Sequence, residues 1–236
     1  MSKRLRSLRK DIQSGRCYKV DDAIKFFTDD YCQKYKAKFN ETIELITKLG
    51  VDVKQSNQMV KGSVGLPNVL DKVKKVAVIA DNSRIRDAQK AGADFIGGED
   101  LIKKIQEGFT DFEVCIATPN MMNKINIIAK ILGPKGLMPD VKIGTISDDI
   151  ATAVKKNKRG HLVFKVDKAG IVHTGIAKIS FTTNKIKENI MSLYNAILLL
   201  KPAKLKGVYI KKLFLTCTHG PSLQLDLRSL LDYPRG

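Results

Sequence analysis

The chain has 236 residues, 43% of them hydrophobic, and its 42 Lys and Arg against 24 Asp and Glu give a net charge of +18. This composition argues against wholesale disorder, and the length is sufficient for one large core or two smaller ones. No apolar run approaches the ~20 residues that span a bilayer, and the basic excess favours a polyanionic partner, most commonly nucleic acid.

The N-terminal stretch 1–10 is basic but leads into Asp11 with no apolar segment, so we expect no signal peptide. It is also too short and too weakly apolar to favour an anionic membrane surface as the partner. Four cysteines are scattered without a Cys-x-x-Cys pair: Cys17, Cys32, Cys115 and Cys217. This pattern favours reduced thiols in a cytoplasmic protein over a disulfide framework or a zinc site, and we expect no metal and no cofactor.

Lysines at positions 34, 36 and 38 alternate with Tyr35, Ala37 and Phe39. In an extended segment this alternation places the cations on one face and the rings on the other. The lysines could then hold phosphates while Phe39 packs on a ribose or a base. The alternative is a solvated charge run with Phe39 in the core. Residues 42–51 follow as a predicted strand.

The middle of the chain alternates between strand-like and helix-like segments. Short apolar runs predict strands at 75–80, 93–96 and 112–117, and the intervening patterns predict helices at 84–90, 99–107, 121–132 and 147–157. Caps are expected at residues 81–83 and at Ser147. Strands with two apolar faces, separated by helices, predict a parallel, Rossmann-like sheet.

The outer segments are typical of an antiparallel sheet with helices on one side. Residues 162–166 and 171–181 predict a hairpin that turns at 168–170. Apolar residues at three- and four-residue steps predict a long helix over 185–200, which ends at Pro202, and 208–217 is the last predicted strand.

We therefore predict a two-domain protein that combines an α+β domain with an inserted α/β domain. The terminal domain comprises residues 1–66 and 161–236, and the insertion comprises residues 67–160. Pro67 and Gly160 stand at the two crossings, as expected of a hinge. The insertion holds 16 Lys and Arg against 12 Asp and Glu, a net of +4, which leaves +14 for the remainder. The terminal domain should therefore be the principal nucleic-acid binder.

Two Gly and two Pro within residues 133–139 cannot continue the preceding helix and predict a fixed, exposed turn. The turn carries a cation, Lys135, and a soft apolar side chain, Met138. Such a loop suits a phosphate or an RNA backbone. The alternative is a purely structural loop between a helix and the next segment.

Residues 216–221 close the last predicted strand with small hydroxyls and a glycine, which would let an RNA backbone approach closely. Thr218 could bond a ribose 2′-hydroxyl, although a strand end followed by a turn explains the same residues. Basic clusters at 155–159 and 201–212 could add to an RNA-binding face. The first cluster ends a predicted helix, where cations interact favourably with the helix dipole, and this explains it at least as well. Solubility alone could explain the second cluster.

An enzyme would need a recognisable constellation, and the chain shows none. It has neither a G-x-G-x-x-G nor a G-x-x-x-x-G-K-[ST] loop, and its three histidines follow no metal-ligand pattern. We predict a protein that is not an enzyme. The rival hypothesis is a nucleotide-dependent RNA enzyme that uses the inserted domain, and nucleotide binding by the purified protein would separate the two.

Several motifs in order resemble the ribosomal protein L1 family, whose members belong to the mobile stalk of the large subunit. The longest is residues 112–139. Shorter words occur at 38–42, 92–99, 166–170 and 218–221, so that the resemblance covers almost the whole chain.

The resemblance implies a set of rRNA-binding residues: Lys38, Phe39, Glu41, Thr42, Lys168, Thr216, Thr218, His219 and Gly220. The sequence departs from the family pattern at His219, where Met is usual, although a histidine can also stack on a base or bind phosphate. We expect a secondary RNA contact at Lys135, Gly136 and Met138.

The resemblance also implies a function. The protein would be a structural constituent of the large ribosomal subunit that binds the large-subunit rRNA stalk and assists release of deacylated tRNA from the exit site. It would repress translation of its own operon mRNA. It would act as a monomer within the cytoplasmic ribosome.

Overall fold

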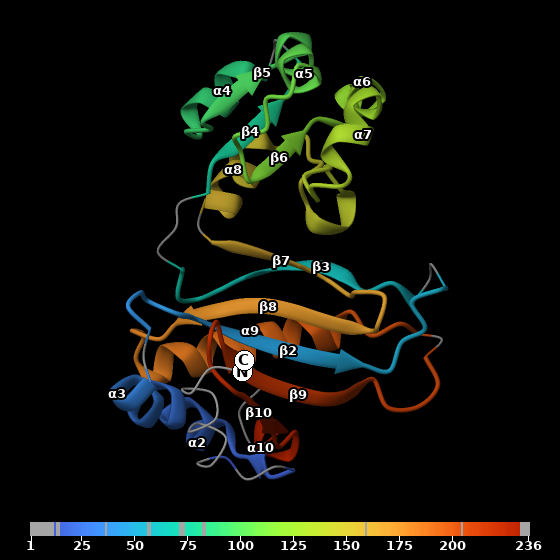
Figure 1. Ribbon diagram of the computed structural model, residues 1–236. Helices are drawn as coiled ribbons and strands as arrows, with labels where there is room; N and C mark the ends of the chain where they lie inside the picture. The colour runs from blue at the N-terminus through green and yellow to red at the C-terminus, as the bar shows by residue number, and fades with distance from the viewer. Residues whose placement is uncertain are drawn as a thin grey trace. The chain divides into compact units, whose positions relative to one another are not determined.

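The computed structural model describes residues 12, 15–35, 37–55, 58–70, 74–81, 84–158, 160–203 and 205–231 (Figure 1). The chain divides into two compact units. The terminal unit comprises Met1–Leu70 with Phe164–Gly236, and the inserted unit comprises Asp71–Val163. From the sequence we place the two crossings near Pro67 and Gly160.

A five-stranded sheet organises the terminal unit, in the order β1-β10-β9-β2-β8. Neighbouring strands are antiparallel except for β1, which pairs parallel with β10. The central strand β2 buries every second side chain, because alternate residues of a strand face opposite sides of the sheet. The strands are β1 (Cys17–Tyr18), β10 (Ser222–Leu225), β9 (Ile210–Cys217), β2 (Thr42–Leu49) and β8 (Ile171–Lys178).

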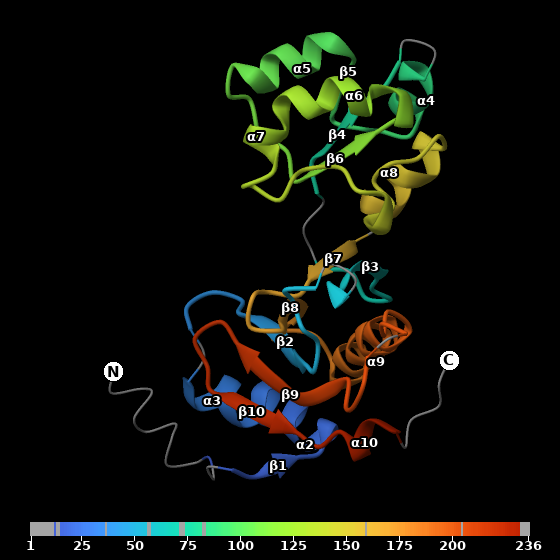
Figure 2. The ribbon, with the colours of Figure 1, turned by 90° about the vertical axis from the view of Figure 1, so that its right-hand side faces the viewer.

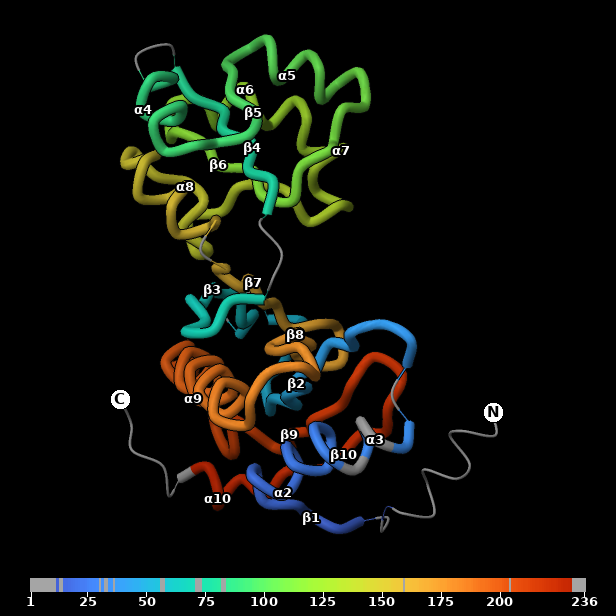
Figure 3. Tube along the Cα trace, turned by 90° about the vertical axis from the view of Figure 1, so that its left-hand side faces the viewer, coloured from blue at the N-terminus to red at the C-terminus, as the bar shows by residue number. Residues whose placement is uncertain are grey.

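Helices cover one face of this sheet. The long helix α9 (Thr183–Leu199) buries Ile186, Ile190, Leu193 and Ile197, as the spacing predicts, and runs behind β8 and β2 in Figure 1. Figure 3 shows the same helix from the left-hand side. On the other face Ile46, His173 and Phe214 are half-buried or exposed, and we call it the open face. The remaining helices are α2 (Val20–Lys25), a π-helical turn (Phe26–Tyr31), α3 (Cys32–Tyr35) and α10 (Arg228–Leu231).

The predicted hairpin is wrong in its pairing. Strand β7 (His161–Lys165) pairs with β3 (Lys61–Gly65), whereas β8 pairs with β2. The turn itself is present, because Asp167 N–H donates to the Ile171 carbonyl at 2.8 Å. Beyond it only one isolated bridge, Val166 to Val172, joins the two segments. Alternation identifies a strand but not its partner, which long-range packing decides.

A three-stranded parallel sheet, ordered β5-β4-β6, forms the inserted unit. Every residue of β4 (Val76–Ile79) and β6 (Val114–Ala117) is buried, because helices pack on both faces (Figure 2). One core joins the sheet to α4 (Ile85–Lys90) and α8 (Ile150–Lys158). The other core joins it to α5 (Glu99–Gln106), α6 (Met122–Ile125) and α7 (Ala129–Leu132); β5 is Phe95–Gly97.

Two local predictions in this unit need correction. The helix expected over 121–132 is broken into α6 and α7 by a 3-10 turn at Asn126–Ile128. Another 3-10 turn, Pro119–Met121, precedes α6, and a third lies at Val141–Ile143. The first turn of α8 is capped by Asp149, whose Oδ1 accepts from Thr152 N–H at 3.1 Å. Ser147 instead accepts from Asp149 N–H. Of the predicted cap at 81–83, residues 82 and 83 lie outside the described residues.

The five-stranded and the three-stranded sheets confirm the predicted fold class, which combines an α+β unit that has a mainly antiparallel sheet with a parallel α/β unit. Among the described helices, none has the length and apolarity that crossing a membrane requires.

Candidate nucleic-acid interface

The ends of three strands meet at one end of the terminal sheet. β2 begins there at Thr42, opposite Lys178 at the end of β8, and Ile43 faces Cys217 at the end of β9. Antiparallel pairing places the start of one strand beside the end of its neighbour. We call this the strand-end surface, formed by Lys38, Phe39, Thr42, Lys178, Thr216, Thr218 and His219.

Thr218 joins two of these strands. Its hydroxyl accepts from Thr42 N–H at 3.1 Å, and its own N–H donates to the Thr42 carbonyl at 3.1 Å. Lys178 Nζ donates to the Thr42 hydroxyl at 2.7 Å. The Thr218 side chain therefore aligns β2 with β9 while it remains exposed at the surface.

Glu41 lies beneath this surface and is fully buried. Its carboxylate accepts from Ala37 N–H at 2.9 Å, from the Tyr31 hydroxyl at 3.0 Å and from His219 N–H at 3.3 Å. The Cys217 thiol is a further donor. Burial opposes ionisation, but these donors together hold the pKa of Glu41 below its ordinary value. The buried anion thus ties segment 37–41 to segment 217–219.

Tyr31 remains protonated in this cluster. Burial, followed by its interactions with Cys217 and Glu41, raises the pKa of its phenol, so that the hydroxyl acts as a hydrogen-bond donor to the carboxylate. The sequence did not identify Tyr31 because it precedes Glu41 by ten residues, at the end of a helical segment with no local motif.

Phe39 and His219 form an exposed aromatic pair. Their ring centroids lie 5.5 Å apart at an interplanar angle of 83°, an edge-to-face arrangement. Phe39 is 48% exposed, which excludes the alternative that it belongs to the core. An exposed aromatic pair on a surface that also carries Lys38 and Lys178 suits a splayed base with its phosphates.

The extended alternation predicted over 34–39 is wrong. Lys34 and Tyr35 end helix α3, Lys38 and Phe39 form a bend, and both of these last side chains are exposed. Lys36 lies outside the described residues. A helix end followed by a bend presents Lys38 and Phe39 to solvent together, whereas alternation would separate them.

Gly220 fits tightly against the protein itself. A Cβ at this position would clash with Cys217 Sγ and would lie 3.3 Å from the Tyr31 ring. The glycine is therefore required by internal packing beside the Glu41 cluster. Thr216 Oγ1 donates to the Pro221 carbonyl at 3.0 Å and fixes the same turn.

Lys168 lies far from these residues along the sheet. Its turn adjoins the opposite end of β2, where Leu49 N–H donates to the Gly170 carbonyl at 2.8 Å. Eight residues of β2 separate the two ends by about 23 Å at ~3.3 Å per residue. The structure thus does not bring Lys168 together with Thr42 and Thr218, although the turns that hold Lys168 and Thr218 both adjoin strands of this sheet.

The loop at 133–139 lies in the inserted unit and packs on its core. Leu137 and Met138 are half-buried against that core, and Gly136 takes a φ of 70°. Lys135 Nζ donates to the Thr110 hydroxyl at 2.6 Å. The structure therefore leaves Gly136 exposed but gives Lys135 an intramolecular partner and Met138 a packing role.

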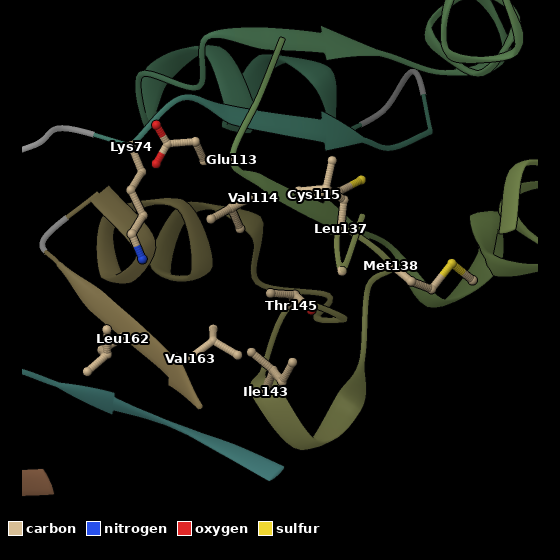
Figure 4. Close-up of a pocket in the computed structure, with 11 residues that line it drawn as sticks. Lys74, Glu113, Val114, Cys115, Leu137, Met138, Ile143, Thr145, Leu162 and Val163 are labelled. Atoms are coloured by element: carbon tan, nitrogen blue, oxygen red, sulfur yellow. The ribbon is translucent and has the colours of Figure 1, made fainter. Parts of the chain in front are cut away.

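A cavity of about 160 Å³ adjoins this loop within the inserted unit, and Leu137, Met138, Ile143 and Val163 contribute to its wall (Figure 4). Burial raises the pKa of the Cys115 thiol to about 12, which leaves it a poor nucleophile. Lys74 Nζ, also at the cavity, donates to the His161 carbonyl at 2.6 Å. No group of three metal-ligating side chains occurs among the residues that the structure describes.

The geometry thus defines a basic, two-unit protein with an exposed aromatic and hydroxyl-rich surface at one sheet edge. Residues 30–221 match the ribosomal protein L1p/L10e family. The chain is 44% identical over 224 residues to the large ribosomal subunit protein uL1 of Bdellovibrio bacteriovorus, which covers 95% of this chain and 94% of the relative.

Two further relatives are also large ribosomal subunit proteins uL1. The protein of Protochlamydia amoebophila is 41% identical over 96% of this chain and 94% of its own length. That of Persephonella marina is 44% identical over 93% of this chain and 91% of its own. The chain belongs to the ribosomal protein L1p/L10e family. This confirms the resemblance found in the sequence and, since the family is one of ribosomal proteins, the prediction that the chain is not an enzyme.

Proposed function

We propose that the protein is a structural constituent of the large ribosomal subunit and binds the large-subunit rRNA stalk through the strand-end surface of its terminal unit. The observation that carries this is the exposed Phe39–His219 pair, held over the buried Glu41 carboxylate. Lys38 precedes Phe39 in the chain, and Lys178 bonds the Thr42 hydroxyl on the same strand-end surface. The net charge of +18 and the family membership support a nucleic-acid partner in the cytoplasmic ribosome.

In this role the residues divide into two groups. Lys38, Phe39, Lys178, Thr218 and His219 are exposed or half-buried and would touch RNA. Glu41 and Gly220 would position that surface from below, since Glu41 is buried and Gly220 packs on Cys217 and Tyr31.

The proposal extends to tRNA and mRNA. With the terminal unit anchored on rRNA, the inserted unit would meet tRNA at the exit site and assist its release, with Lys135 and Gly136 as the candidate contact. Because Lys135 bonds Thr110, that contact would require the lysine to change partners. The protein would repress its own operon by binding an mRNA segment at the strand-end surface, so mRNA and stalk rRNA should compete.

Titration of the purified protein with transcribed stalk rRNA tests the proposal. Phe39→Ala should weaken binding by about 1–3 kcal/mol, the scale of a lost base stack, which is about 5- to 150-fold in Kd. Phe39→Tyr should retain most of the affinity. Ile127→Ala, another exposed apolar side chain but in the inserted unit, is the control. Wild-type affinity in a folded Phe39→Ala protein would overturn the assignment.

A further inference from the structure

A β-bulge interrupts the pairing of β2 with β9 at the end of the sheet that lies away from the strand-end surface. Lys48 faces Lys212, but Leu49 faces Ile210, so Lys211 has no partner on β2. A bulge re-aims side chains that regular alternation would send to opposite faces. Here it leaves two consecutive lysines, Lys211 and Lys212, both exposed.

Gly50 makes room for this arrangement. A Cβ on Gly50 would lie 3.1 Å from Lys211 Cε and closer still to the Val208 carbonyl oxygen. Gly50 N–H donates to the Tyr209 carbonyl at 2.7 Å. The Lys211 side chain thus lies over a residue that has no side chain, and a larger residue at position 50 would displace it.

The bulge also places like charges side by side. Lys48 and Lys212 are directly opposite across the two strands, a position where equal charges repel and destabilise a sheet. Within the described part of the chain, no ion pair to a carboxylate is formed by Lys48, Lys211 or Lys212. The oxygens of the nearby Asp52 instead accept from Lys54 N–H and from the Gln55 side chain.

We propose that Lys48, Lys211 and Lys212 form a second RNA contact, which binds the phosphate backbone without regard to base sequence. The proposal rests on the proposed function and adds to it a site about 20 Å from Thr42, given the six residue steps along β2 from Thr42 to Lys48. Three exposed cations that form no ion pair with a carboxylate of the described residues suit phosphates rather than bases. The repulsion between Lys48 and Lys212 is relieved when a polyanion lies across them.

The decisive measurement is the salt dependence of RNA binding by the full-length protein. The triple variant K48A/K211A/K212A is compared with K19A/K25A/K185A, which removes three exposed lysines from α2, its N-terminal flank and α9, on the covered side of the sheet. The probes are transcribed stalk rRNA and a short RNA duplex of unrelated sequence. Each lost phosphate contact should make the slope of log K against log salt shallower by about 0.7–0.9.

We expect the first variant to lose about two to three units of slope on both probes and the control to lose less than one. Lys212→Glu should in addition raise the melting temperature, because it pairs with Lys48, while it weakens RNA binding. Equal slopes for the two triple variants would overturn the second contact, as would a Lys212→Glu protein with unchanged affinity. If the wild-type protein does not bind stalk rRNA, it is the proposed function that fails.

Discussion

Glu41 shows how a residue can belong to a binding motif without touching the ligand. Among the described residues, its carboxylate accepts hydrogen bonds from two backbone N–H groups, a phenol and a thiol. A Gln amide cannot accept through its nitrogen, so Glu41→Gln leaves donors unpaired. We expect a loss of about 2 kcal/mol of unfolding free energy at neutral pH, with weaker rRNA binding. Glu44→Gln, in the strand β2 that follows Glu41 and on the open face, is the control.

The pH dependence of this loss follows from the lowered pKa of Glu41. A carboxyl whose folded-state pKa is depressed contributes stability above its unfolded pKa, and that stability is lost as the pH falls through the folded value. The difference in unfolding free energy between wild type and Glu41→Gln should therefore shrink as the pH is lowered from 7 into the acidic range. Urea melts at several pH values check this, and a difference that stays constant would contradict an ionised Glu41.

Thr218 combines a structural and a binding role, which a pair of substitutions can separate. Thr218→Val removes the acceptor for Thr42 N–H, so we expect a stability loss of about 1 kcal/mol. Binding of rRNA should weaken by a further 1–3 kcal/mol, roughly the scale of a desolvated partner left unpaired. Thr218→Ser keeps the hydroxyl and should restore both properties. Thermal melts and RNA titrations on both variants measure the two effects independently.

At the scale of elements, α9 holds the first crossing segment in place. The side chain of Asn189, which is fully buried, accepts from Asn68 N–H at 3.0 Å and donates to the carbonyls of Asn68 at 2.8 Å and Ile176 at 2.7 Å. Pro67, proposed as a hinge, directly precedes this clamp. Bending of the first crossing should therefore occur after Asn68.

Asn189→Ala tests the clamp. It leaves one N–H and two carbonyls without their partner, and we expect a loss of about 2–4 kcal/mol in unfolding free energy. Hydrogen exchange at the Asn68 amide should accelerate markedly. Ser192→Ala, which removes a longer bond of 3.3 Å from the same helix to Gly65, is the matched control and should change neither quantity much. Unchanged protection of Asn68 in Asn189→Ala would rule out the clamp.

The elements show which parts of the fold local sequence could predict. Strand β2 and helix α9 follow from alternation and from three- and four-residue spacing, because one face of each is buried. The partner of β7 could not be predicted, since β3 lies about a hundred residues earlier and has no motif that specifies pairing. The role of Glu41 could not be predicted either. The sequence pointed to it as an rRNA contact, whereas its burial beneath the Phe39–His219 pair becomes visible only when segments 37–41 and 217–219 are seen together in the folded chain.

At the scale of the whole molecule, the uneven charge predicts where RNA affinity resides. A protein of residues 1–70 joined by a short linker to 164–236 keeps both the Asn189 clamp and the strand-end surface. We expect it to retain most of the rRNA affinity and nearly the full salt dependence, while the isolated segment 71–163 binds much more weakly. Filter binding on the two proteins compares them directly. Equal affinity of the inserted unit would refute the assignment of rRNA binding to the terminal unit.

Gly160 bears on how the second crossing can be tested. Its φ of 84° lies in the left-handed region, which proline cannot adopt. Gly160→Pro would therefore distort the crossing instead of stiffening it. Gly160→Ala is the milder probe of the proposed hinge, with an expected strain of roughly 1–2 kcal/mol. Near-normal rRNA affinity together with an altered distance between fluorescent labels on the two units would support the hinge, whereas an unchanged distance distribution would count against it.

Cys217 is buried and packs closely against Gly220 and Tyr31, so the rate at which its thiol is alkylated can report the opening of the strand-end surface. An alkylating reagent can reach Cys217 only when segment 217–220 lifts away from Tyr31, whereas Cys17 is exposed and should react at once. The rate of slow labelling at Cys217 therefore measures how often the surface opens. Bound stalk rRNA should slow that rate and leave Cys17 unaffected, and mass spectrometry of the labelled peptides would follow both reactions in one sample.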